Sequence, residues 1–323
     1  MRESLGSRHG AEELTKHLDA VYTALIADVE RYGGSVIGFA GDAITCWFDD
    51  MHGPAARRAN ACAFALQEAM SIFAAIALPN GATARLSLKV AVASGPARRF
   101  TVGDPEIHYL DALAGVTVVR TSTAEQLAQK DEVLLDEATV QALGVELAVR
   151  KWLTDTSDER FAVLTQYTGQ ATETAFPESV PVLDATTLQG WVHSLVYDRE
   201  QSGQGAFLSE FRPCVAVFVR FMGIDYDAAE AQAQLDAFIR QMQVIGSRYE
   251  GTLIQLNIGD KGSYAYLNFG ALSAHEDDAR RAAKAALELL AAAENMGFLG
   301  PLQIGITQGL MRLGAYGGQT RRT

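Results

Sequence analysis

Two long stretches of the chain carry apolar residues at helical spacing, and each is followed by two short apolar runs. In the first stretch, residues 11–32, apolar side chains recur every three or four positions, which is the period of one helix face. Gly33 follows, as glycine often does at a helix end. Runs 35–40 and 43–48 then flank Gly41-Asp42. The pattern predicts a helix followed by a β-hairpin.

The same order of elements recurs later in the chain. A second helical stretch covers residues 227–249, and runs 252–258 and 263–269 flank Gly259-Asp260. The Arg-Tyr pairs that end the two helices begin at 31 and 248, an offset of 217 (248 − 31). Further along, residues 89–95 and 303–309 match at an offset of 214 (303 − 89). Matches in the same order at nearly constant spacing indicate a duplicated domain.

Each copy continues in the same way, with a second helix and another strand. The sequence predicts these helices over 54–77 and 276–293, and the strands over 86–94 and 302–308. An apolar run at 214–221 precedes the second copy, whereas the first copy has no such strand. Strand, helix, hairpin, helix, strand is a ferredoxin-like plan. We therefore expect an α+β protein with a first domain over 1–165 that lacks its first strand, a linker over 166–207, and a second domain over 208–323.

Composition and charge narrow the possible partners and setting. The net charge of −12 over 323 residues disfavours nucleic acid, which needs clustered Lys and Arg, and would also repel anionic lipid. The three cysteines, Cys46, Cys62 and Cys214, lie far apart in the sequence and imply neither a disulfide framework nor a zinc site. The sequence shows no signal segment and no membrane span, so a cytoplasmic setting is expected.

The first hairpin resembles a known enzyme family. Residues 30–43, Glu-Arg-Tyr-Gly-Gly-Ser-Val-Ile-Gly-Phe-Ala-Gly-Asp-Ala, resemble the hairpin of class III adenylyl and guanylyl cyclases. Residues 8–14 resemble the entry to the family's first long helix, and residues 309–323 resemble the stretch before its last catalytic segment. The order of the two halves looks most like the bicarbonate-responsive soluble adenylyl cyclases, truncated at both ends.

The resemblance implies an architecture and a chemistry. Two cyclase homology domains would pack as a pseudo-twofold intramolecular heterodimer with ATP between them. Two Mg²⁺ or Mn²⁺ ions would assist the conversion of ATP to 3′,5′-cyclic AMP and pyrophosphate, because paired cations can stabilise both the attacking and the leaving oxygen. Asp42 matches one metal-binding aspartate of the family, although Gly-Asp is also ordinary turn chemistry.

Other site residues are carried over position by position. Nucleotide binding is expected at Gly38, Phe39, Ala40, Gly41 and Gln255, where Gln255 stands at the base-reading position and can otherwise be a plain polar strand residue. Arg120 resembles the arginine of the family's regulatory pseudo-site, and the alternative is a solvated arginine at a helix start.

The sequence also departs from the family pattern. The strand with the other metal aspartate should precede Met1, and Arg220 stands at its place in the second half. The family's Asn-x-x-x-Arg pair should lie beyond Thr323, and Gly38 replaces the lysine of bicarbonate-responsive members. We therefore expect this chain alone to lack cyclase activity, and its incomplete sheets to favour self-association.

Three functions stay open at this point. The first is a fragment of an adenylate cyclase whose longer parent is the active enzyme. The second is a non-catalytic pseudo-cyclase module that binds nucleotide or a partner and regulates another activity. The third is an unrelated ferredoxin-like regulatory domain that dimerises. An upstream strand and a downstream Asn-x-x-x-Arg helix in the parent would favour the first.

Overall fold

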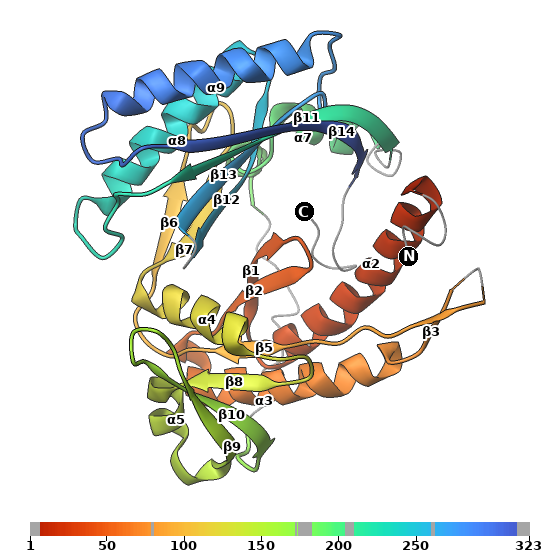
Figure 1. The fold of residues 1–323 in the computed structure, drawn as a ribbon, viewed down its shortest axis with the longest axis vertical. Coiled ribbons are helices and arrows are strands. Elements are labelled where there is room, and N and C mark those ends of the chain that lie inside the picture. Colours follow the sequence, from red (N-terminus) through yellow and green to blue (C-terminus); the bar gives the residue numbers. More distant parts are fainter. Residues whose placement is uncertain are drawn as a thin grey trace. The chain divides into compact units, whose positions relative to one another are not determined.

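The structure is a computed structural model that describes residues 7–78, 81–171, 173, 183–203, 210–259 and 262–314. Asp260 and the glycine-rich stretch from residue 315 onward lie outside the described residues. The chain divides into two compact units (Figure 1). Unit 1 holds the described residues up to Pro96 and those from Thr117 to 173, and unit 2 holds Ala97–Val116 together with those from 183 onward. Each unit is described separately below.

Unit 2 is built on an antiparallel sheet with the strand order β12-β13-β11-β14. Apolar residues alternate along β11, so that Val215, Val217 and Val219 enter a core with the apolar faces of two long helices. These helices, α8 and α9, lie on one face of the sheet (Figure 1). The bounds are β11 Glu210–Phe221, α8 Ala231–Arg248, β12 Thr252–Gly259, β13 Gly262–Phe269, α9 Asp278–Glu294 and β14 Gln303–Leu313.

A hairpin from the first half of the sequence is part of unit 2. Strands β6 (Arg98–Val102) and β7 (Leu110–Ala114) pair with each other, and Phe100 and Val102 are buried in the same core as α8. Gln232 of α8 donates a hydrogen bond to the Thr101 carbonyl at 2.9 Å. Because these contacts bury apolar and polar groups together, the hairpin is integral to the unit-2 core.

Two short helices within the predicted linker, residues 166–207, also belong to unit 2. They are α6 (Ala185–Gln189) and α7 (Ser194–Gln201). Asp184 caps α6 through the Thr187 N–H at 2.8 Å, the usual role of an aspartate at this position. The range 166–207 therefore contains helical structure in its described parts.

Unit 1 begins with the predicted long helix and hairpin, α2 (Ser7–Arg31), β1 (Ser35–Ala40) and β2 (Ala43–Trp47). The apolar face of α2 packs on the hairpin and on the next helix, α3 (Ala55–Ala69). Arg58 of α3 is only 2% exposed. Its guanidinium donates to the carbonyls of Tyr32, Gly33 and Asp49, and so fastens both ends of the hairpin to α3.

The second part of unit 1 is a four-stranded sheet with the order β5-β8-β10-β9. Helices α3 and α5 pack against β8 and β10, and α4 follows the return of the chain from unit 2. The bounds of the sheet strands and helices are β5 Val90–Val92, α4 Val116–Leu127, β8 Val133–Asp136, α5 Glu137–Leu143, β9 Leu147–Thr154 and β10 Arg160–Tyr167. Two further short strands pair with each other, β3 Ile76–Ala77 and β4 Thr83–Ala84. The 3₁₀ turns are η1 Asp50–His52, η2 Met70–Phe73 and η3 Gly144–Glu146.

The α+β prediction is confirmed, and two predicted elements need correction. The helix predicted over 54–77 ends at Ala69 and continues as a 3₁₀ turn and the short strand β3, because tertiary pairing with β4 takes over the apolar residues near Ile76. The strand predicted over 86–94 forms only at Val90–Val92. Among the described residues, no helix is long and apolar enough to cross a bilayer.

Candidate functional site

The Gly-Asp turn of the first hairpin is exposed, and a residue of α2 contacts its backbone. Gly41 adopts the left-handed region with φ 64°, which glycine reaches without strain. The hydroxyl of the buried Tyr22 donates to the Gly41 carbonyl at 2.9 Å, and the Tyr22 ring meets Phe39 edge-on at 5.2 Å. Asp42 is exposed at this turn. Its carboxylate is therefore presented to solvent on a fixed backbone.

The predicted nucleotide-binding glycines lie on the same hairpin. Ideal Cβ atoms at Gly38 and Gly41 would meet nothing within 4 Å, and Ala40, which pairs with Ala43 beside the turn, is exposed. The tip of the hairpin is thus an exposed surface of small residues around one carboxylate. Because no large side chain stands in the way, a bulky ligand can approach the backbone closely.

The described residues do not fit the two-ion site that the resemblance implies. They contain no group of three or more His, Cys, Asp or Glu side chains placed to hold a metal ion. A hard divalent cation needs several oxygen ligands, and Asp42 supplies one carboxylate. We therefore derive no chemical step through a metal from this part of the chain.

The open face of the unit-2 sheet carries a row of polar and aromatic side chains around Gln255. Gln255 pairs with Tyr266 in register, and Tyr266 pairs with Phe218, which pairs with Gly305. Phe218 is 52% exposed, whereas Val217 beside it is 1% exposed, so the two residues face opposite sides of the sheet. The rings of Phe218 and Tyr266 stack at 4.8 Å with an angle of 16°.

A buried amide lies next to this aromatic pair. Asn268 is 3% exposed, and its Nδ2 donates to the Tyr266 hydroxyl at 2.6 Å. Burial raises the pKa of Tyr266, and this hydrogen bond partly offsets the effect. The Oδ1 atom of Asn268 is buried and has no hydrogen-bond partner among the described residues. A buried acceptor without a donor costs free energy, so Asn268 carries an unsatisfied acceptor next to the aromatic pair.

The neighbouring row on the same face carries a cation. Asn257, Tyr264, Arg220 and Gln303 are aligned across the four strands by the pairing register. The guanidinium of Arg220 donates to the Gln303 Oε1 at 3.0 Å, and the Gln255 amide donates to Asn257 at 3.4 Å. These two rows therefore combine an aromatic surface, several carboxamides and the positive charge of Arg220.

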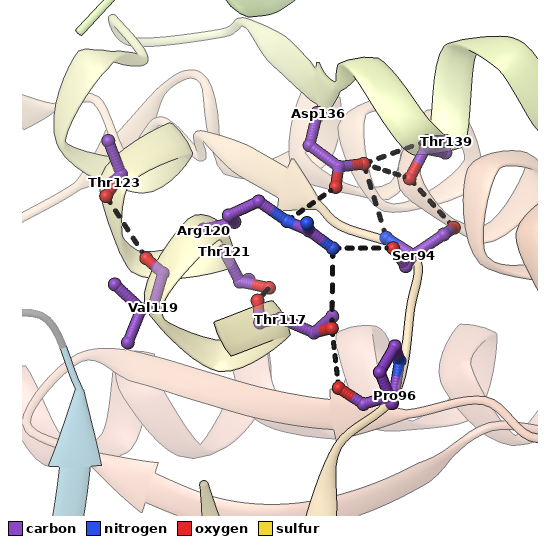
Figure 2. A network of polar contacts seen from close by, with 9 residues as sticks. All are labelled: Ser94, Pro96, Thr117, Val119, Arg120, Thr121, Thr123, Asp136 and Thr139. Carbon is purple, nitrogen blue, oxygen red and sulfur yellow. Dashed lines mark hydrogen bonds and ion pairs between the residues drawn. The ribbon is translucent and has the colours of Figure 1, made fainter. Parts of the chain in front are cut away.

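Arg120, the predicted pseudo-site residue, is tied into a network inside unit 1 (Figure 2). Its Nε lies 3.0 Å from the Asp136 Oδ2, and its Nη2 donates to the Ser94 carbonyl at 2.8 Å. Asp136 is 2% exposed and accepts from the Thr139 N–H and hydroxyl. The guanidinium thus joins α4, the stretch that follows β5 and the start of α5, and is not a solvated arginine at a helix start.

The aromatic residues of the unit-2 face and the neighbouring Asn268 are not evident from the sequence alone. Phe218, Tyr266 and Asn268 stand in or beside apolar runs, and such a run does not show which side chains face the helices. The available signal was the register of the second hairpin, because a residue two strands from Gln255 can be located once the pairing of β11 with β13 is known.

Comparisons with known proteins identify the fold of the chain but do not show a family by sequence. No protein-family model matches the sequence, and no curated protein matches it. A solved structure described as a class III adenylyl cyclase-like ATP-binding protein from Pseudomonas aeruginosa is similar over 96% of this chain and 71% of its own, with a TM-score of 0.59 and 14% identity. The chain therefore has the fold of class III cyclase-like proteins.

Two further solved structures cover smaller parts of the chain. The guanylate cyclase domain of RhGC from Catenaria anguillulae, solved with GTP, covers 51% of this chain and 90% of its own, with a TM-score of 0.44 and 17% identity. The adenylyl cyclase CyaB from P. aeruginosa covers 35% of this chain and 64% of its own, with a TM-score of 0.31 and 22% identity. At these scores the two matches add nothing to the assignment of the fold.

Proposed function

We propose that this chain is a nucleotide-binding module of the class III cyclase fold, in which the open face of the unit-2 sheet binds the purine base. The observation that carries the proposal is the row Gln255, Tyr266 and Phe218 beside the unpartnered acceptor of Asn268. A planar base can stack on an exposed aromatic ring, and carboxamides can bond both donors and acceptors on its edge.

The first hairpin has a separate role in this proposal. The two halves pair about a pseudo-twofold axis, and Asp42 binds a Mg²⁺ or Mn²⁺ ion that the nucleotide phosphates also ligate. The support is the exposed, backbone-fixed position of Asp42 beside small residues. A bound nucleotide would bring the additional oxygen ligands that a divalent ion requires.

The chain by itself is proposed to bind ATP without converting it to cyclic AMP. The described residues offer one carboxylate at the hairpin and no group of metal-binding side chains, and Arg120 is engaged with Asp136 and Ser94. A second candidate function is adenylate cyclase activity in a longer polypeptide. The exposed carboxylate of Asp42 supports it, because Asp42 stands at the position that matches a metal-binding aspartate of the family.

Isothermal titration of the full chain with ATP and MnCl₂ tests the base site. Phe218→Ala should weaken ATP binding about tenfold, since stacking contributes about 1–3 kcal/mol per base. Gln255→Ala should change the ratio of ATP to GTP affinity. Trp152→Ala, which removes another partly exposed aromatic residue on β9 of unit 1, is the matched control. Equal binding by the Phe218→Ala variant and the unchanged protein would overturn the proposed base site.

Two further measurements test the proposed metal role of Asp42 and the proposed lack of cyclase activity. Asp42→Asn should remove the dependence of ATP affinity on Mn²⁺ while leaving binding without the ion unchanged. A chromatographic assay for cyclic AMP should detect no product from the chain with ATP and Mn²⁺. Sustained cyclic AMP production by this chain would contradict the non-catalytic assignment.

A further inference from the structure

Two histidines meet where the segment 183–203 docks inside unit 2. His108 lies in the loop between β6 and β7, and His193 is the residue before α7, with ring centroids 5.8 Å apart. His108 is 7% exposed, and its Nδ1 is buried without a hydrogen-bond partner among the described residues. A buried imidazole in this state is most stable when it is neutral.

The second imidazole must also be neutral to keep its hydrogen bond. The His193 Nδ1 accepts from the Leu195 N–H at 3.3 Å and so caps the start of α7. A protonated imidazole donates from both nitrogens and cannot accept. Protonation of His193 would therefore remove the cap of α7, and protonation of both rings would place two positive charges next to each other.

The segment is held to the same loop by further contacts that do not titrate near neutral pH. The Tyr109 N–H donates to the Gly190 carbonyl at 2.6 Å, and the rings of Tyr109 and Trp191 lie 5.6 Å apart. Gly190 approaches the Tyr109 ring closely, since a Cβ there would lie 3.2 Å from it. These contacts fix where the segment docks, and the histidine pair lies directly beside them in sequence.

The charged groups around the pair are already paired with each other. Arg240 of α8 forms ion pairs with Asp236 at 2.7 Å and with Asp104 of the loop at 3.9 Å, and Asp236 accepts from the Gly103 N–H. Gln243 of α8 bonds the His108 carbonyl, and the Leu253 carbonyl on β12 faces the His108 ring. Among the described residues no carboxylate pairs with either imidazole, so protonation at this point is uncompensated.

We propose that His108 and His193 form a pH-sensitive latch, which holds residues 183–203 on the β6–β7 loop at neutral pH and releases them in mild acid. Burial lowers the pKa of His108 to about 4 and also lowers the pKa of His193, so that both rings are neutral while the segment is docked. On release His193 leaves its buried position, and His108 of the loop loses the neighbouring ring, so that the pKa values of both return toward the ordinary value near 6.5 and the rings take up protons. Release is thus driven by proton uptake as the pH falls below this range.

Trp191 provides a local readout of the latch. The other two tryptophans, Trp47 and Trp152, are replaced by Phe so that fluorescence reports only on the segment. Between pH 8 and pH 4.5 the Trp191 emission should shift to the red and become more accessible to acrylamide, reversibly. The circular dichroism of the whole chain should stay nearly unchanged over the same range, which separates release from global unfolding.

Two variants and one control decide the outcome. His193→Asn keeps an acceptor at the helix cap and does not titrate, and combined with His108→Phe it should move the midpoint down by at least one pH unit. His275→Asn, at a histidine paired with Glu250, should leave the midpoint unchanged. The latch is refuted if the double variant shows the unchanged transition. It is equally refuted if the Trp191 signal changes only together with the circular dichroism. If His108→Phe does not fold, the His193→Asn variant alone must still shift the midpoint.

Discussion

The hairpins β1–β2 and β12–β13 follow the same local design but lie in different sheet surroundings. Both contain a bulge at the equivalent position, at Ile37 and at Ile254, which the pairing register skips. β13 also pairs with β11, so that its hairpin belongs to a four-stranded sheet, whereas β1 and β2 form a two-stranded sheet among the described residues. The hairpin is thus encoded locally, while the sheet around it depends on residues distant in sequence.

The two hairpins are also anchored differently. In unit 1, Arg58 bonds three backbone carbonyls at the hairpin ends. In unit 2, the hairpin is anchored by the apolar core around Phe269 and by the contacts of Glu288 with Arg248 and Tyr249. A hairpin paired on one side only is marginal alone, so we infer that the buried guanidinium substitutes for the missing sheet contacts.

The largest expected loss of stability comes from removing the buried guanidinium of Arg58. Arg58→Met keeps the apolar volume of the side chain but leaves the three carbonyls without their donor. It should destabilise unit 1 by about 3 kcal/mol, measured by urea unfolding with Trp47 on β2 as the fluorescent reporter. Arg57→Met, which removes a more exposed ion pair with Glu146, is the matched control and should cost less than about 1 kcal/mol.

The glycines that begin the two hairpins give the next largest effect. A Cβ at Gly251 would lie 2.4 Å from the Phe269 ring, and a Cβ at Gly34 would lie 2.5 Å from the Phe48 ring. Phe269 is fully buried, whereas Phe48 is only partly buried and can move. Gly251→Ala should therefore cost about 3 kcal/mol and Gly34→Ala about 1 kcal/mol. Equal losses in thermal unfolding of the two variants would show that both rings are held alike.

Much of this comparison could be predicted from the sequence, because it rests on short-range patterns. The hairpin strands 35–40, 252–258 and 263–269 are correct to within a residue or so, since alternating apolar residues around Gly-Asp leave few alternatives. The sequence also predicts that Arg58 lies in a helix, since it falls within the helix predicted over 54–77. Its three carbonyl partners could not be predicted, because they come from two turns that only the packed structure brings together.

The rest of the fold and site depends on long-range contacts that no local pattern encodes. The β6–β7 hairpin belongs to the core of unit 2 through Phe100 and Val102, although it lies in the first half of the sequence. Arg120 finds Asp136 only because β8 and α5 meet at that residue. The placement of Phe218 on the open face required the register of β11 with β13.

Acid should weaken unit 2 more than unit 1. The pKa of His108 is lowered by burial to about 4 from 6.5, so its contribution to stability is complete above pH 6.5 and is lost as the pH falls toward 4. The loss amounts to about 2–3 kcal/mol. Urea unfolding at pH 7.5 and pH 5 should show this loss, and His108→Phe should remove most of it. A pH dependence that is unchanged in this variant would assign the effect to other groups.

The smallest expected effect tests the exposed anchor of unit 2. Glu288→Gln removes the ion pair with Arg248 and weakens the bond from the Tyr249 hydroxyl. Exposed pairs of this kind contribute little, so the melting temperature should change within experimental error. A clear decrease, similar to that of Arg58→Met, would mean that both hairpins depend on a polar anchor.

The most direct test of the nucleotide-binding account is hydrogen–deuterium exchange of the full chain with and without saturating ATP and Mn²⁺. The account predicts slower exchange in β11, β12 and β13, around Phe218, Gln255 and Tyr266, with a smaller change at the Gly41-Asp42 turn. ATP binding that leaves these three strands unchanged would contradict the proposed base site, and a lack of binding altogether would contradict the proposed function.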